Sequence, residues 1–174
     1  MGSQQRRSGA ESEGFTHLDE FGAAQMVDVG GKPHSRRTAC ARAVCTMSPT
    51  TAKSIREVTS KKGDVLPVAR LAGIGAAKRT DELIPLCHGI PIERVDVEFE
   101  WLNETQLEVR VTSACTGKTG VEMEAMVGAS IAALTVYDMC KAMDREMQIG
   151  SVELLSKTGG SRGDYHRDRE QQDS

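Results

Sequence analysis

One segment limits what this chain can fold into more than any other. Residues 121–143, "VEMEAMVGASIAALTVYDMCKAM", predict a long helix over 121–144 whose surface is apolar almost all round. A helix of that kind has to be buried on most of its sides. The chain has 174 residues, enough for one well-packed domain. Because one domain leaves little chain to cover the helix, we expect part of its surface to face another subunit.

Four charged side chains interrupt this helix: Glu122, Glu124, Asp138 and Lys141. Buried charges are costly unless they are paired or used in function. Asp138 and Lys141 are i,i+3 neighbours, so a simple helix ion pair explains them on an exposed face. Glu122 and Glu124 lie in the first turn, where the helix dipole favours carboxylates. Each of these two pairs can therefore have either a structural or a functional role.

The spacing of these charges adds a geometric constraint. Glu124 and Asp138 are 14 residues apart in the sequence. That spacing corresponds to roughly 21 Å along a straight helix at about 1.5 Å per residue. A single small-molecule site does not readily take both side chains from one chain. If both are functional, a second subunit completes the site, so the sequence predicts an active site at a subunit interface.

The rest of the core predicts an α+β fold. The segment 94–102, "RVDVEFEWL", alternates apolar and charged residues, which is typical of a half-buried antiparallel strand. Residues 107–115 return as the second strand of a hairpin. The other predicted elements are strands at 24–30, 36–47 and 147–160 and helices at 51–58 and 68–83. Helices packed on one face of such an antiparallel sheet form a ferredoxin-like sandwich.

Composition divides the chain into a core and two polar ends. Residues 1–22 and 161–174 are rich in Ser, Gln, Gly and charged residues, with little to bury. They predict a flexible N-terminal segment and a polar C-terminal tail. Between them, residues 23–160 predict a single folded domain.

The overall composition also excludes several classes of protein. The formal net charge is −3, and a general nucleic-acid binder would show a basic stripe instead. No apolar run approaches the roughly 20 residues needed to cross a bilayer, and the N-terminus has no apolar signal region. The five cysteines form no CxxC pair, which is typical of a reduced cytoplasmic protein. Their spacing predicts no metal site.

The stretch "TSACTGKTG" (112–120) is similar to the start of a phosphate-binding P-loop, but the match fails. A P-loop requires a glycine where this chain has Thr112. Thr112 also lies inside a predicted strand, so no loop is available to surround a phosphate. Gly117 and Gly120 instead allow a tight turn into the long helix, whose first amides can bind an anion.

Two further lysines lie beside predicted glycine turns. Lys62 precedes Gly63 at a break between two helices, and Lys157 precedes Thr158-Gly159-Gly160. Lysines in such places hold phosphates as point charges or act as acids and bases, although a plain surface role is the alternative. His88, in the loop "LIPLCHGIP", is the best histidine candidate, with a hydrogen bond to the backbone as its structural alternative.

Five motifs occur in order along the chain: "KKGDV", "AGIGAAKRTDELIPLCH", "TGKTGVEMEAM", "AALTVYDMCKA" and "LLSKTGG". Together they closely resemble the cyclic pyranopterin monophosphate synthase family, the MoaC family of molybdenum cofactor biosynthesis. The resemblance covers about residues 23–165 without large gaps. Only the two ends of the chain fall outside it.

The resemblance implies a specific reaction and assembly. The family is a lyase family that converts 3′,8-cyclo-7,8-dihydro-GTP, made from GTP by a radical enzyme, into cyclic pyranopterin monophosphate with release of pyrophosphate. Its fold is ferredoxin-like, and its homohexamer is a trimer of dimers with active sites at the dimer interface. It requires no cofactor, while Mg²⁺ is able to accompany the triphosphate. A non-catalytic ferredoxin-like module that binds a nucleotide or regulates a partner is the alternative.

The resemblance also assigns residues. Asp138 looks like the essential acid–base residue, with Lys141 and Lys62 as its catalytic partners and phosphate contacts. The expected substrate-binding residues are Leu86, Cys87, His88, Met123, Glu124, Glu122, Lys157 and Arg37. Arg36 precedes Arg37, which leaves the register of that assignment open. Gly89 follows His88 where the family commonly has a proline, so the local shape of that loop is in doubt.

Overall fold

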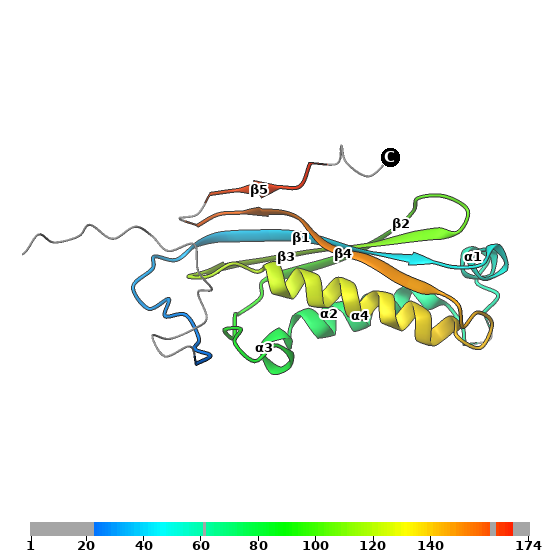
Figure 1. The fold of residues 1–174 in the computed structure, drawn as a ribbon, viewed down its shortest axis with the longest axis horizontal. Helices are drawn as coiled ribbons and strands as arrows, with labels where there is room; N and C mark the ends of the chain where they lie inside the picture. The colour runs from blue at the N-terminus through cyan, green and yellow to red at the C-terminus, as the bar shows by residue number, and fades with distance from the viewer. Residues whose placement is uncertain (1–22, 61, 161–162, 169–174) are drawn as a thin grey trace, which may run out of the picture.

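The computed structural model describes residues 23–60, 62–160 and 163–168. They form an α+β sandwich in which one five-stranded antiparallel sheet carries helices on one face (Figure 1). In chain order the elements are β1 (Ser35–Thr46), α1 (Pro49–Arg56), α2 (Val65–Ala77), α3 (Thr80–Leu83), β2 (Arg94–Trp101), β3 (Gln106–Gly117), α4 (Glu122–Cys140), β4 (Gln148–Thr158) and β5 (Tyr165–His166). The predicted flexible segment 1–22 lies outside the described residues, as do 161–162 and 169–174.

The strand order is β2-β3-β1-β4-β5, with β1 in the centre. β1 pairs with β3 along its whole length, from Ser35↔Gly117 to Thr46↔Gln106, and with β4 on its other side. β2 and β3 form the predicted hairpin. The described part of the C-terminal tail adds β5 to the outer edge of β4. The predicted ferredoxin-like fold class is confirmed.

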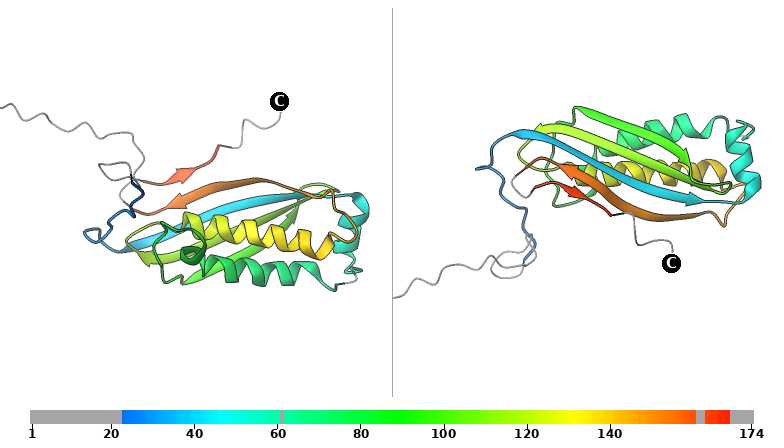
Figure 2. Two further views of the ribbon diagram at one scale, coloured as in Figure 1. Left: turned by 60° about the horizontal axis from the view of Figure 1, so that its bottom comes forward. Right: turned by 90° about the horizontal axis from the view of Figure 1, so that it is seen from above.

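The core lies between the sheet and two helices, α2 and α4, which cover the same face of the sheet (Figure 2). Val109 and Val111 of β3 are fully buried against Ala129 and Val136 of α4. Alanines on the inner side of α4 allow its backbone to lie close to β1 and β3. The helix is therefore fixed along much of its length by contacts with the middle of the sheet.

Charged side chains cross the face of the sheet that carries no helix. Glu108 of β3 is only 1% exposed, and its carboxylate accepts from Arg42 of β1 at 3.1 Å and from Arg110. Arg42 also reaches Glu153 of β4 at 2.5 Å. Pairing of both Glu108 oxygens offsets the cost of burying the carboxylate. This network links three neighbouring strands at a distance from the cavity described below.

Three predicted elements have different bounds in the structure. Residues 24–30 form no strand apart from an isolated bridge at Ala24, so that prediction is wrong. The helix predicted at 68–83 is two helices, because the chain turns at Lys78-Arg79 between α2 and α3. α4 ends at Cys140 instead of continuing to residue 144. There the chain turns, and Asp144 accepts the backbone N–H of Ser48 at 2.7 Å.

By length and composition α4 could cross a membrane, contrary to the expectation that no segment approaches that length. It has 19 residues and a mean hydropathy of 1.2. It lies against β1 and β3, however, which is the position of a core helix. Only 44% of its most apolar stretch is buried within the chain. Apolar side chains of the rest of the helix are partly or largely exposed in the separate chain, with Leu134 51% exposed.

Two glycines set the distance between α2 and α4. A Cβ atom on Gly73 would lie 3.0 Å from the carbonyl oxygen of Gly128 and 3.1 Å from Cβ of Ala132. A Cβ atom on Gly128 would meet Val111 at 3.0 Å. The close crossing of the two helices therefore depends on the absence of side chains at both positions.

Paired substitutions in α2 test this packing. Gly73→Ala is expected to lower the free energy of unfolding by about 1–3 kcal/mol, because the added methyl group overpacks the crossing. Gly75→Ala is the matched control, since its Cβ atom would meet only the flexible side chain of Arg79. The control is expected to gain up to about 1 kcal/mol from helix propensity. Urea unfolding of the three proteins measures both effects, and equal stabilities would contradict the packing described here.

Candidate active site

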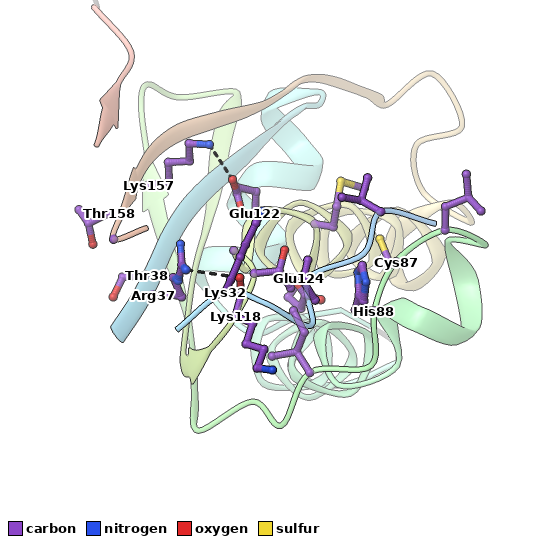
Figure 3. Close-up of a pocket in the computed structure, with 18 of the residues that line it drawn as sticks. Lys32, Arg37, Thr38, Cys87, His88, Lys118, Glu122, Glu124, Lys157 and Thr158 are labelled. Atoms are coloured by element: carbon purple, nitrogen blue, oxygen red, sulfur yellow. Dashed lines mark hydrogen bonds and ion pairs between the residues drawn. The ribbon is translucent and has the colours of Figure 1, made fainter. Parts of the chain in front are cut away.

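A cavity of about 380 Å³ opens where α4 begins (Figure 3). Its walls come from β1, the turn before α4, the end of β4, the loop after α3 and the segment before β1. All of the residues predicted to bind substrate line this cavity: Leu86, Cys87, His88, Met123, Glu124, Glu122, Lys157 and Arg37. The fold thus brings together residues from four separate parts of the chain.

Glu122 and Lys157 form an ion pair in the cavity wall. Lys157 Nζ of β4 lies 2.9 Å from Glu122 Oε1 in the first turn of α4, and Figure 3 shows the two side chains pointing toward each other. A side chain at position 120 would displace the Glu122 carboxylate. Gly120 of the sequence Gly-Lys-Thr-Gly therefore leaves the space in which this pair forms. Thr112 lies within β3, as expected, so the sequence does not form a P-loop.

Arg37 projects from β1 into the same cavity. It is 9% exposed and donates from Nε to the carbonyl of Gly117 and from Nη2 to that of Lys118, both at 3.4 Å. Gly160, with φ +94°, lies so close that any side chain there would overlap the guanidinium group. Arg36 instead pairs with Glu93. Arg37, and not Arg36, therefore lines the cavity.

Glu124 is the most buried carboxyl group of the cavity. It is 3% exposed, and its Oε2 atom has no hydrogen-bond partner among the described residues. The pKa of Glu124 is raised to about 7, mainly by burial, which its own backbone N–H opposes and the nearby charges of Glu122 and Asp81 reinforce. Near neutral pH this carboxyl group therefore exchanges its proton with solvent or with a ligand.

The loop after α3 supplies Leu86, Cys87 and His88, each half-buried. The backbone N–H of Cys87 donates to the carbonyl of Ile84 at 3.0 Å and fixes the turn. Burial, followed by the charges of Glu124 and Asp81, raises the pKa of the Cys87 thiol. The thiol therefore stays protonated at neutral pH, which does not suit a nucleophile.

Several lining residues had not been predicted from the sequence. They are Val27, Val29, Lys32, Thr38, Ile90, Lys118, Thr119, Gly120, Thr158, Gly159 and Gly163. Lys118 donates from Nζ to the carbonyl of Gly30 at 2.6 Å and so holds the segment before β1 beside the cavity. The glycines around Lys118 had predicted a turn at this position, but they did not predict its contact with Gly30. Lys32 lies in a segment without any distinctive pattern.

The three predicted catalytic residues form a separate cluster at the other end of α4. Lys141 Nζ lies 2.6 Å from Asp138 Oδ1, and Lys62 Nζ lies 3.3 Å from Oδ2 and 2.8 Å from the Asp138 carbonyl. Hydrogen bonds from Lys141 and then Lys62 hold the pKa of Asp138 below its usual value. The side chain of Asp138 is 56% exposed, so this cluster is open to a partner.

Within one chain, the cavity and the cluster of Lys62, Asp138 and Lys141 lie far apart. None of Lys62, Asp138 and Lys141 lines the cavity. Along α4, Asp138 lies roughly 21 Å from Glu124 in the cavity wall, at about 1.5 Å per residue. α4 is fixed against the sheet, so a hinge within the helix does not close this distance. Both groups serve one ligand only if a second chain brings its cluster to the cavity of the first.

The charges of the cavity indicate what it binds. Four cationic side chains line it, from Lys32, Arg37, Lys118 and Lys157, beside the carboxyl groups of Glu122 and Glu124. Cations of this kind suit phosphate groups. Within the described part of the chain no three His, Cys, Asp or Glu side chains converge as metal ligands. The fold and cavity define a ferredoxin-like protein with a pocket lined by several cationic side chains.

Comparison with known proteins gives the family. The model of the MoaC family matches residues 26–160. This chain belongs to the MoaC family.

Individual relatives are similar over most of the chain. The cyclic pyranopterin monophosphate synthase of Peptoclostridium acidaminophilum is 53% identical over 154 residues, which cover 88% of this chain and 98% of that protein. The protein of the same name from Brevibacillus brevis is 53% identical over 88% of this chain and 96% of its own length. Molybdenum cofactor biosynthesis protein 1 of Mus musculus is 50% identical over 91% of this chain, which spans 25% of the mouse protein.

The burial of Glu124 predicts a pH-dependent effect on stability. Its pKa is about 7 in the folded chain against a reference value of 4.5. The folded chain therefore binds more protons between these pH values, and this group's contribution to stability falls as the pH rises through that range. At pH 8 we expect Glu124→Gln to raise the free energy of unfolding by about 1–3 kcal/mol, and at pH 4 we expect little change.

Urea unfolding at both pH values, at one protein concentration, measures this effect. Glu98→Gln, at an exposed position on β2, is the matched control and is expected to change little at either pH. The same difference between Glu124→Gln and wild type at pH 4 and pH 8 would contradict the raised pKa of Glu124.

Proposed function

We propose that this chain is a cyclic pyranopterin monophosphate synthase, a lyase of molybdenum cofactor biosynthesis. It converts 3′,8-cyclo-7,8-dihydro-GTP into cyclic pyranopterin monophosphate and releases pyrophosphate. The observation that carries the proposal is the cavity at the start of α4, where cationic side chains and a titratable carboxyl group meet. The names of the bacterial relatives, which this chain covers almost completely, support the same reaction.

The chemistry of this reaction suits the cavity. A triphosphate carries several negative charges, and expulsion of pyrophosphate requires positive charge near the leaving group. Lys32, Arg37, Lys118 and Lys157 supply that charge. Rebuilding a purine-derived ring as a pterin requires repeated proton transfers. Glu124 and the loop Leu86-Cys87-His88 lie where the ring of a bound substrate would contact them.

We propose that the Asp138 cluster acts on substrate held by a neighbouring subunit. In the separate chain both Asp138 and its lysines are about half exposed. Apolar side chains of both long helices are exposed, with Leu71 of α2 71% and Leu134 of α4 51% exposed. Apolar patches of this kind mark protein contacts. A dimer with shared sites, assembled further into a homohexamer, agrees with these exposures.

Within the shared site, Asp138 is the residue that accepts a proton. Hydrogen bonds from Lys141 and Lys62 lower its pKa and keep it ionised, which is the form that can accept a proton. Lys141 and Lys62 hold its two oxygens and contact phosphate or donate protons. Met123, at the start of α4, lines the cavity, and we expect it to contact the ring of the substrate.

The setting of the reaction follows from its substrate. No resident cofactor is proposed, and any Mg²⁺ enters with the triphosphate rather than in a protein site. The protein works in the cytoplasm, next to the radical enzyme that cyclises GTP. It binds neither nucleic acid nor a membrane.

The alternative is a ferredoxin-like module without catalytic activity. That alternative predicts an exposed Asp138–Lys141 pair and no effect of Asp138→Asn. The pair is exposed in the separate chain, so exposure by itself favours neither function. The effect of substituting Asp138 separates the two.

A coupled assay tests the proposal. GTP is supplied to the radical partner enzyme, this protein is added, and pyrophosphate and the pterin product are measured together. We expect product from the wild type and a loss of about 10²–10⁴-fold from folded Asp138→Asn, which removes an acid–base group. Asp96→Asn, on β2 beside Arg94, is the control and is expected to keep full activity. No product from an assembled wild type, or full activity of Asp138→Asn, would contradict the proposal.

A further inference from the structure

Two carboxyl groups in the first turn of α4 differ sharply in their surroundings. Glu122 is partly exposed and is paired with Lys157 at 2.9 Å. Glu124 is nine-tenths or more buried, has no cationic partner at ion-pair distance among the described residues, and keeps Oε2 without a hydrogen bond. A buried polar atom without a partner costs stability, so a native protein that retains one requires an explanation. The cavity supplies one, because Glu124 lines it.

Each element around Glu124 adds to the same environment. Asp81 of α3 and Glu122 of α4 place negative charge nearby. The thiols of Cys87, in the loop after α3, and Cys115, in β3, are close enough to interact with Glu124. Burial raises the pKa of both thiols, and the charge of Glu124 raises them as well. The other titratable or charged groups that line the cavity are Lys32, Arg37, His88, Lys118 and Lys157.

Gly89 has a specific part in this environment. A Cβ atom at position 89 would lie 2.8 Å from Oδ2 of Asp81. The glycine therefore gives the Asp81 carboxylate room beside the loop that carries Cys87 and His88.

From this arrangement we propose that Glu124 is the general acid of the cavity, which gives the proton on Oε2 to the bound ring while Asp138 acts as the base. The inference rests on the proposed function and adds a catalytic role for a residue otherwise expected only to bind substrate. Two carboxyl groups in contrasting environments divide acid and base roles in this way. The buried, unpaired Glu124 favours the protonated form, and Asp138 between two lysines favours the ionised form.

The proton transfer balances without any further reagent except water. The proton leaves Oε2 for a ring nitrogen as the bond from that nitrogen to carbon breaks, and the electron pair of the bond stays on the nitrogen. Water adds to the carbon and loses a proton to the Asp138 carboxylate, which releases it to solvent, while the Glu124 carboxylate takes up a proton from solvent. The acid is regenerated, and no redox change takes place.

Carboxyl titration tests the protonation state independently of activity. Protein labelled with ¹³C at the Glu side-chain carboxyl carbons is titrated by NMR, and the signal lost in Glu124→Gln identifies Glu124. We expect its midpoint at about pH 7. In Asp81→Asn the midpoint is expected at lower pH, because the substitution removes a negative charge that favours protonation. A midpoint near the reference value of 4.5 would overturn the inference even in an active enzyme.

Kinetics tests the catalytic role. For the wild type we expect kcat/KM to fall about tenfold per pH unit above the Glu124 midpoint, because the protonated form is required. Asp81→Asn is expected to shift this fall to lower pH. Glu124→Gln is expected to lower kcat by about 10²–10⁴-fold with KM changed less than about threefold, and the exposed Glu98→Gln to match the wild type.

The outcomes separate this inference from the proposed function. Glu124→Gln with kcat within about threefold of the wild type, or a pH profile that Asp81→Asn does not move, overturns the acid role while the synthase remains established. No product from the wild type overturns the proposed function and the acid role with it. In that case the NMR midpoint still reports whether Glu124 is held protonated.

Discussion

The rigid burial of α4 is the constraint on which the rest of this structure depends. Its alanines pack against β1 and β3, and its Gly128 meets Gly73 of α2 without space for a methyl group. A helix held in this way is straight and cannot bring its two ends together. The cavity at its start and the Asp138 cluster at its end are consequently fixed apart. An enzyme that needs both has to assemble them from two chains.

The same helix also gives its carboxyl groups different chemistry. Glu122 and Glu124 are two residues apart, and residues at that spacing do not face the same direction on a helix. Glu122 reaches Lys157 of β4, whereas Glu124 is directed among buried groups of α3, β3 and the loop after α3. Asp138 lies between two lysines in the open. Position along one helix therefore decides which carboxyl group holds its proton near neutral pH.

Much of this could be predicted from the sequence, and the misses have physical reasons. The alternation in 94–101 and the apolar surface of α4 are local patterns, so the sheet and its helix layer were predictable. The separation of Glu124 from Asp138 followed from residue spacing alone. The strand predicted at 24–30 was wrong, because the conformation of this segment depends on a contact of Gly30 with Lys118, 88 positions away. The raised pKa of Glu124 likewise depends on burial by elements distant in sequence.

Subunit mixing tests the central claim, a site shared between two chains, most directly. Asp138→Asn and Lys157→Met damage opposite halves of the site, and each variant assembled separately is expected to be inactive. Coexpressed in equal amounts with different tags, they form mixed dimers in about half of the population, each with one intact site, so about one quarter of the wild-type activity is expected. The doubly tagged fraction, which contains only mixed dimers, is expected to reach about one half of the wild-type activity, and that result agrees with the account. Inactive mixed dimers would contradict it and place the whole site within one chain.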